Sequence, residues 1–158
     1  MKVSTRSIAR AAVIAGAYAG LCVLLAPVSY GVLQVRVAEG LTVLPILWPD
    51  AVVGLTLGAL IANLAGPFGI IDAIFGTAAT ALAAYLTYWR RRSRAPYIYP
   101  IIANGLIVGA YLPIVTHMEI HWWTFPATML AVAAGEAVAV LAFGLPLLHA
   151  LRKIGLGK

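Results

Sequence analysis

Six polar side chains interrupt long apolar stretches of the sequence, and their types suit the binding of a small polar molecule. They are one arginine, three carboxylates and two amides: Arg36, Glu39, Asp72, Glu136, Asn63 and Asn104. A charged side chain within a membrane-spanning segment costs about 2.5–3.5 kcal/mol, so it usually faces a partner or a cavity. These residues therefore predict a polar pocket inside an apolar protein.

Most of these residues also have a structural explanation. Arg36 and Glu39 are three residues apart, so they can pair on one helix face. Asp72 can cap the helix that follows it, because carboxylates are favourable at helix N-termini. Asn104 is of a type that more often makes a hydrogen bond between helices than a ligand contact. Glu136 has the fewest such explanations, because it lies deep within an apolar segment.

A cluster of histidine and tryptophan residues lies between the last two apolar segments. His117 and His121 are four residues apart, a spacing that can hold a metal ion on a helix. Two candidate ligands in a predicted loop are too few, and we predict no metal site. Trp122 and Trp123 are typical of side chains that anchor a protein at the membrane interface.

The composition indicates the elements that must position these groups. Hydrophobic residues make up 63% of the 158 residues and charged residues only 10%, whereas a soluble domain has about 25% charged residues. We predict an all-α integral membrane protein, one transmembrane domain over residues 1–158, with Cys22 buried and unable to form a disulfide. The expected spans are 8–27, 37–48, 51–65, 70–89, 98–116 and 124–150.

Pro45 and Pro49 leave one alternative open, in which 37–64 is a single kinked helix and the chain has five spans. The charges favour six. With six spans and both termini in the cytoplasm, ten of the eleven Lys and Arg residues are cytoplasmic and only Arg36 is outside. The same clustering at segment ends argues against nucleic-acid binding, despite the net charge of +6.

The first span carries small residues at a spacing that lets another helix approach closely. Ala11, Ala15 and Ala19 recur every four residues, and a second small stripe lies beside them. The stripe could pack within this chain or dock a separate membrane partner. The sequence has no phosphate-binding loop, nucleophile elbow or zinc-protease motif, so we predict that it is not an enzyme and uses no cofactor of its own.

The segment from Tyr30 to Pro45 has the pattern Gly-x-x-Gln-x-Arg-x-x-Glu-x-Leu-Thr-x-Leu-Pro. It resembles the QueT family, the substrate-binding S components of energy-coupling-factor (ECF) transporters for queuosine precursors. Matching stretches also lie at 54–64 and 72–77, and Gly40 stands where the pattern leads us to expect alanine. The resemblance implies a six-span S-component bundle in a prokaryotic cell membrane, an outward-facing pocket for a 7-deazaguanine, a shared transmembrane subunit and two ATPase subunits that use ATP. The alanine stripe resembles the surface of S components that meets the shared subunit.

Under this hypothesis each polar group has an expected role toward 7-aminomethyl-7-deazaguanine or queuine. A carboxylate can accept both donors of a guanine-like pairing edge, which we assign to Glu39. Asp72 or Glu136 would meet the cationic amine. The ring carbonyl and the ring face have several candidate partners: Arg36, Gln34, Asn63 or Asn104 for the carbonyl, and Tyr30 or Trp122 for stacking. The rival hypotheses are a stand-alone carrier or channel and a small membrane enzyme.

Overall fold

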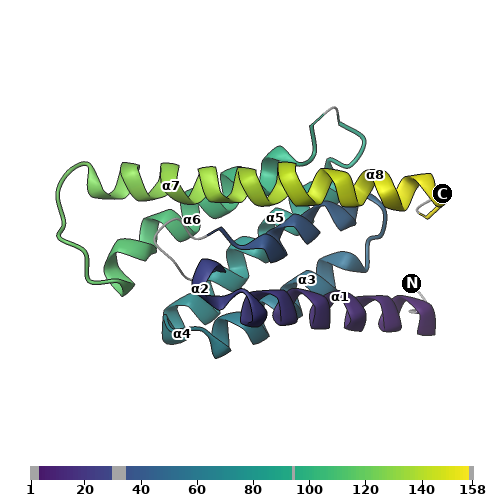
Figure 1. The fold of residues 1–158 in the computed structure, drawn as a ribbon, viewed down its shortest axis with the longest axis horizontal. Coiled ribbons are helices and arrows are strands. Elements are labelled where there is room, and N and C mark those ends of the chain that lie inside the picture. The colour runs from purple at the N-terminus through teal and green to yellow at the C-terminus, as the bar shows by residue number, and fades with distance from the viewer. Residues whose placement is uncertain (1–3, 30–34, 94, 157–158) are drawn as a thin grey trace.

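Six helical segments build the protein in this computed structural model, which describes residues 4–29, 35–93 and 95–156. Four of them are long and apolar enough to cross a membrane, and two are shorter. The described residues form helices and turns without a strand. In chain order (Figure 1) the elements are α1 (Thr5–Leu24), α2 (Ala26–Ser29), η1 (Val37–Ile46), α3 (Ala51–Ala65), α4 (Gly69–Ile71), η2 (Asp72–Gly76), α5 (Thr77–Trp89), α6 (Ile98–Val115), α7 (Thr124–Val138), η3 (Ala139–Gly144) and α8 (Leu145–Lys153).

The six predicted segments are confirmed, and the single kinked helix over 37–64 is wrong. The short helix η1 ends at Ile46 and α3 begins at Ala51. Proline restricts the residue before it to extended conformations and has no N–H, so Pro49 separates the two helices. Pro45 lies inside η1 and does not end it. The chain therefore has two short helices here. A single long helix would have placed all later segments in the opposite orientation across the membrane.

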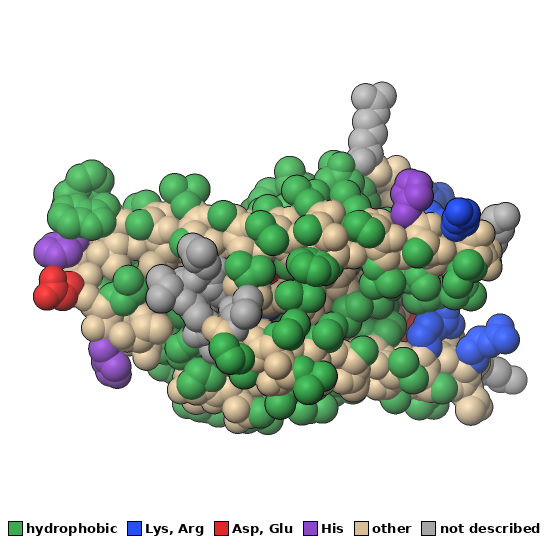
Figure 2. Space-filling view, in the orientation of Figure 1, with side chains coloured by type: hydrophobic (Ala, Val, Ile, Leu, Met, Phe, Trp, Pro, Cys, Tyr) green, Lys and Arg blue, Asp and Glu red, His purple; other side chains and the backbone are tan. Residues whose placement is uncertain are grey.

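The outer surface of the bundle is apolar. Figure 2 shows hydrophobic side chains over the length of the molecule, while Lys and Arg gather at the end where both termini lie. Large side chains such as Leu24, Leu130 and Val13 are 70–80% exposed, which in water would be unfavourable over so wide an area. The protein is a multi-pass membrane protein whose exposed apolar side chains face lipid.

Helices α1 and α3 pack closely because small residues meet at their contact. A Cβ atom on Gly58 would lie 2.8 Å from the Ala15 carbonyl oxygen, and one on Gly54 would lie 2.7 Å from that of Ala11. Ala15 and Ala19 are buried. The stripe of Ala11, Ala15 and Ala19 thus packs within the chain, which was the alternative to docking a partner.

The neighbouring small stripe of α1 is open. Gly16 and Gly20 have no other part of the described chain within 4 Å of an added Cβ atom, and Ala12 is exposed. If a partner approaches α1 closely, this face is the one that the described part of the chain leaves accessible.

Replacing Gly58 by alanine is expected to destabilise the protein by about 1–3 kcal/mol, because the new methyl group overpacks the α1–α3 contact. Thermal unfolding of the purified protein in lipid nanodiscs would measure the change. The matched control is Gly16→Ala on the open face, which should be neutral or slightly stabilising, since alanine is the better helix former. Equal effects of the two substitutions would contradict the close α1–α3 contact.

Gly40 also has a packing reason. A Cβ atom there would lie 2.9 Å from the Ala139 carbonyl oxygen, where η1 crosses η3. The alanine that the resemblance led us to expect at this position would therefore not fit without a shift of η3.

Candidate functional site

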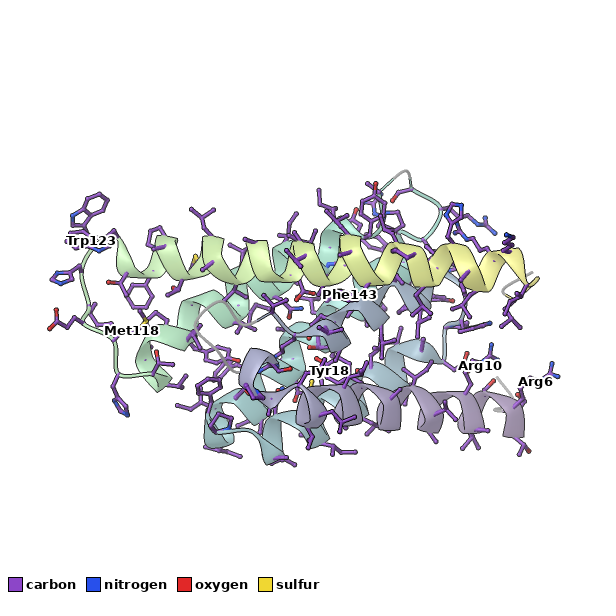
Figure 3. All side chains as sticks on the ribbon, in the orientation of Figure 1. Arg6, Arg10, Tyr18, Met118, Trp123 and Phe143 are labelled. Carbon is purple, nitrogen blue, oxygen red and sulfur yellow. The ribbon has the colours of Figure 1, made fainter. Side chains whose placement is uncertain are left out.

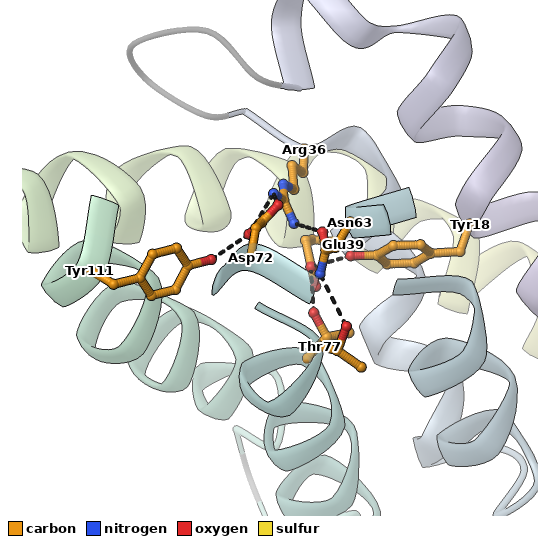
Figure 4. A network of polar contacts seen from close by, with 8 residues as sticks. Tyr18, Arg36, Glu39, Asn63, Asp72, Thr77 and Tyr111 are labelled. Atoms are coloured by element: carbon orange, nitrogen blue, oxygen red, sulfur yellow. Dashed lines mark hydrogen bonds and ion pairs between the residues drawn. The ribbon is translucent and has the colours of Figure 1, made fainter. Parts of the chain in front are cut away.

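The buried polar residues meet where η1 lies inside the bundle. Figure 4 shows residues of α1, η1, α3, η2, α5 and α6 converging on one network. All six of the polar residues that first drew attention in the sequence are at most 5% exposed: Arg36, Glu39, Asn63, Asp72, Asn104 and Glu136. The sequence predicted a polar pocket from the cost of placing such groups in apolar segments, and the structure brings these residues together.

Arg36 and Asp72 form the ion pair of this network. The Nη2 atom of Arg36 lies 3.0 Å from Asp72 Oδ2, and its Nη1 donates to Asn63 Oδ1 at 2.8 Å. The Tyr111 hydroxyl donates to the other carboxylate oxygen of Asp72. Pairing of Arg36 with Glu39 on one helix face was one alternative left open by the sequence; the ion pair of Arg36, which directly precedes η1, is with Asp72 of η2.

The interpretation of Asp72 as a helix cap is wrong. The helix continues through it from Gly69 to Trp89, and η2 is a wide, π-helical turn at this point. Gly76 makes room for the pair, because a Cβ atom there would lie 2.5 Å from Asp72 Oδ1. Single wide turns of this kind are frequent at functional sites, where they turn a side chain inward.

Glu39 is held by hydroxyl groups from two other helices. The Tyr18 hydroxyl of α1 and the Thr80 hydroxyl of α5, at 2.9 Å, both donate to its Oε1 atom. Its Oε2 atom is buried and has no hydrogen-bond partner among the described residues. One side of this carboxylate is therefore fixed, and the other remains able to accept.

Glu136 is hydrogen-bonded to the side-chain amide of Asn104, on the neighbouring helix. The Asn104 Nδ2 atom of α6 donates to Glu136 Oε1 of α7 at 3.0 Å, so the interhelical hydrogen bond predicted for Asn104 is confirmed. The Asn104 Oδ1 atom has no partner within the described chain. It is a second buried acceptor left open.

A small buried cavity lies between these groups. It is lined by four polar and two apolar side chains: Arg36, Glu39, Asn104, Glu136, Val108 and Val132. Its volume is about 10 Å³, room for about one water molecule. A pocket for a small ligand usually measures about 300–1,000 Å³, so helices or loops around the cavity must move apart before a base-sized molecule fits.

A much larger hollow lies elsewhere among the described residues, at the end of the molecule opposite the termini. It measures about 570 Å³ and is mostly apolar, with Phe68, Trp123 and His121 among its lining residues. Figure 3 shows Trp123 and Met118 at this end, far along the bundle from Tyr18. The hollow lies between α6 and α7, as the buried cavity does. Leu112 and Thr128 line its inner end, and they are one helical turn from Val108 and Val132 of the cavity.

Not every predicted site residue joins the cluster. Trp122 is 85% exposed and packs edge-on against Trp123. It does not line the buried cavity, so its stacking role stays a prediction. Tyr30 and Gln34 lie outside the described residues. Asn63 contacts Arg36 and Thr77 and supports the site without lining the cavity.

Sequence reasoning missed the hydroxyl groups that position the carboxylates. Tyr18, Tyr111 and Thr80 are buried and donate to Glu39 or Asp72. The available signal was weak, because tyrosine and threonine are common in apolar helices. Among the described residues, no group of three or more His, Cys, Asp or Glu side chains is placed to hold a metal ion.

Comparison with known protein families agrees with the fold. A family model described as QueT transporter matches residues 8–153, nearly the whole chain. No curated protein and no solved structure matches the chain. The six helical segments, the apolar surface and this match together place the chain in the QueT transporter family.

Proposed function

We propose that this protein is the substrate-binding S component of an energy-coupling-factor importer and that its ligand is a 7-deazaguanine with a cationic amine. The observation that carries the proposal is the buried cavity bordered by Glu39 and Glu136, at which the acceptor atoms Glu39 Oε2 and Asn104 Oδ1 have no partner among the described residues. Such acceptors call for a ligand rich in N–H donors, since an unpaired buried polar atom costs about 1–3 kcal/mol. A 7-aminomethyl-7-deazaguanine offers donors at its pairing edge and at its amine.

The two carboxylates have different roles in this proposal. Glu39 is fixed on one oxygen by Tyr18 and Thr80 and would accept the paired donors of the base with the other. Asp72 already pairs with Arg36, so Glu136 remains to meet the amine. Arg36 also borders the cavity and would donate to the ring carbonyl.

The direct test is ligand binding by the purified chain in nanodiscs. We expect 7-aminomethyl-7-deazaguanine and queuine to bind in a calorimeter and adenine to bind far more weakly. Adenine carries an acceptor where guanine has its ring N–H donor, and a carboxylate would face that acceptor unpaired. The absence of binding by both deazaguanines would refute the proposed substrate class.

We also propose that both termini face the cytoplasm of a prokaryotic cell. Arg10 pairs with Asp50 at 2.8 Å and lies over the ring of Trp48, so the start of α1 and the η1–α3 turn lie at one end. Basic side chains gather at that end (Figure 2), as cytoplasmic ends do. A cysteine at His121 should react with an impermeant reagent added to intact cells, and one at Ser93 should not. Labelling at Ser93 would contradict this orientation and indicate the reverse one.

Partner docking is the part of the proposal that separates an S component from a stand-alone carrier. No motif for ATP hydrolysis occurs in the sequence, so in the proposed importer ATP is used by two partner ATPase subunits through a shared membrane subunit. The open face of α1 at Ala12, Gly16 and Gly20 suits close approach by a partner helix. Ala11 and Ala15 do not, because α3 already covers them.

Replacing Gly16 by leucine is expected to leave ligand binding by the isolated chain unchanged and to lower ATP-dependent uptake by the assembled transporter at least tenfold. The bulky side chain would hold a partner helix away, while lipid would accept it. Ala15→Leu is the contrasting variant: it should destabilise the isolated chain by about 1–3 kcal/mol through overpacking against Gly58. Full uptake by Gly16→Leu would remove this face from the contact, and uptake by the chain alone in liposomes would favour a stand-alone carrier.

A further inference from the structure

The buried cluster has more negative than positive groups. Among the described residues it contains three carboxyl groups and one guanidinium group: Glu39, Asp72, Glu136 and Arg36. The opposite charges of Arg36 and Asp72 cancel each other in their ion pair. Glu39 and Glu136 remain, and both border a cavity with room for about one water molecule.

Two ionised carboxylates around one buried cavity inside a membrane protein are unfavourable. Little water is present to screen them, and a buried charge without a compensating partner is expensive. Two carboxyl groups that share a site in other proteins hold one proton between them for this reason. The same physics predicts a single proton on this pair while the site is empty.

The hydrogen bonds indicate which carboxyl group carries the proton. Glu39 accepts from two hydroxyl donors, Tyr18 on α1 and Thr80 on α5, which favour its ionised form. Among the described residues, Glu136 accepts one neutral amide N–H, from Asn104 on α6. A proton on Glu136 would also supply a donor to a cavity that holds unpartnered acceptors.

The other titratable groups around Glu136 do not offer an alternative. On η1 the cavity is bordered by Arg36 and Glu39, and on η2 Asp72 is occupied by Arg36 and Tyr111. Neither α5 nor the rest of α7 places a charged side chain in the cluster. On α1 the titratable groups are Tyr18, already a donor, and the thiol Cys22, both buried.

We propose that Glu136 holds a proton while the site is empty and exchanges it for the cationic amine of the substrate. The Glu136 O–H bond breaks as the ammonium group arrives, the carboxylate and the ammonium form an ion pair, and the proton leaves to the outer solution. The charge of the cluster is then the same before and after binding. This exchange rests on the proposed function, and it makes Glu136 the residue that selects a cationic over a neutral deazaguanine.

Proton exchange predicts the direction in which ligand affinity changes with pH, and this change can be measured. Because the ligand and a proton compete for Glu136, affinity for the amine should rise with pH, by up to about tenfold per unit while the group is still protonated in the empty protein. A neutral analogue leaves the proton in place, so its affinity should not change with pH. Above the range in which the amine itself is charged, affinity should fall again.

The test is calorimetry of the full chain in nanodiscs, in two buffers of different ionisation enthalpy at several values between about pH 5.5 and 8. The probe is 7-aminomethyl-7-deazaguanine, and the neutral control is 7-cyano-7-deazaguanine, whose nitrile carries no charge. We expect close to one proton released per amine bound at the acidic end and none with the nitrile. Amine binding without proton release at any of these values would overturn the exchange while leaving the proposed function standing.

Glu136→Gln separates this group from other titrating residues. Glutamine imitates the protonated acid, so the variant should fold, bind the amine at least tenfold more weakly, and show neither proton release nor a dependence on pH. His149→Gln on the exposed face of α8 is the control and should retain both. Proton release that persists in Glu136→Gln would overturn the assignment to Glu136, and failure of both deazaguanines to bind native protein would overturn the proposed function as well.

Discussion

Replacing Glu39 by glutamine is expected to weaken deazaguanine binding by about 30- to 150-fold. The amide oxygen would keep the donors Tyr18 and Thr80, which turns the amide NH₂ toward the cavity where Oε2 is now open. That donor would face a donor of the base. A mismatch to a hydrogen bond with a charged group costs about 2–3 kcal/mol, which corresponds to this loss of affinity.

Calorimetry with 7-aminomethyl-7-deazaguanine would measure the effect, and the matched control is Glu119→Gln. The Glu119 side chain is 93% exposed in the loop before α7, so the same change there should leave affinity within about twofold. Native affinity in Glu39→Gln would remove Glu39 from the base edge. The carboxylate of Glu136 would then be the remaining candidate at the cavity.

Replacing Asp72 by asparagine is expected to lower the free energy of unfolding by about 3–5 kcal/mol, because it leaves the charge of Arg36 buried without its ionic partner. Arg36 is 5% exposed and Asp72 is fully buried. The double variant Arg36→Gln/Asp72→Asn should recover much of the loss, since it removes the uncompensated charge. Thermal or denaturant unfolding in nanodiscs would measure all three proteins.

The control for this cycle is an ion pair of similar length near the surface. Arg10 and Asp50 are 2.8 Å apart and 26% and 13% exposed, so Arg10→Gln should cost no more than about 1 kcal/mol. If Asp72→Asn costs no more than Arg10→Gln, the Arg36–Asp72 pair does not hold η1 against η2 in the way the structure indicates.

The helices themselves could be predicted from the sequence because their causes are local. A bilayer requires about 20 apolar residues per full span, and the apolar runs end at proline or at charged residues. Even the two short helices, Val37–Ile46 and Ala51–Ala65, were predicted separately. The deciding argument was the position of basic clusters, which does not depend on how the helices pack.

The membership of the polar site could also be predicted in large part. A carboxylate or guanidinium inside an apolar segment must find a partner, and Arg36, Glu39, Asp72 and Glu136 do share one cluster. Trp122 lies outside this cluster and is 85% exposed, so its stacking role stays a prediction, because an interfacial tryptophan and a stacking tryptophan look alike in sequence.

The pairing within the site was decided by the tertiary structure. Spacing along one helix suggested Arg36 with Glu39, but η2 brings Asp72 to the guanidinium and α1 and α5 bring hydroxyl groups to Glu39. Residues 18, 36 and 72 are remote in the chain, and no local rule relates them. Helical periodicity says which residues share a face, but not which helix that face will meet.

The same distinction applies to α1. The sequence determined that it carries two small-residue stripes, because small residues at every fourth position lie on one side of a helix. Only the fold decided that Ala11 and Ala15 meet Gly54 and Gly58 of α3, leaving the stripe with Gly16 open. Both stripes have small residues that allow close approach. Which of them packs against α3 depends on where the glycines of α3, about 40 residues later in the chain, are placed when the bundle assembles.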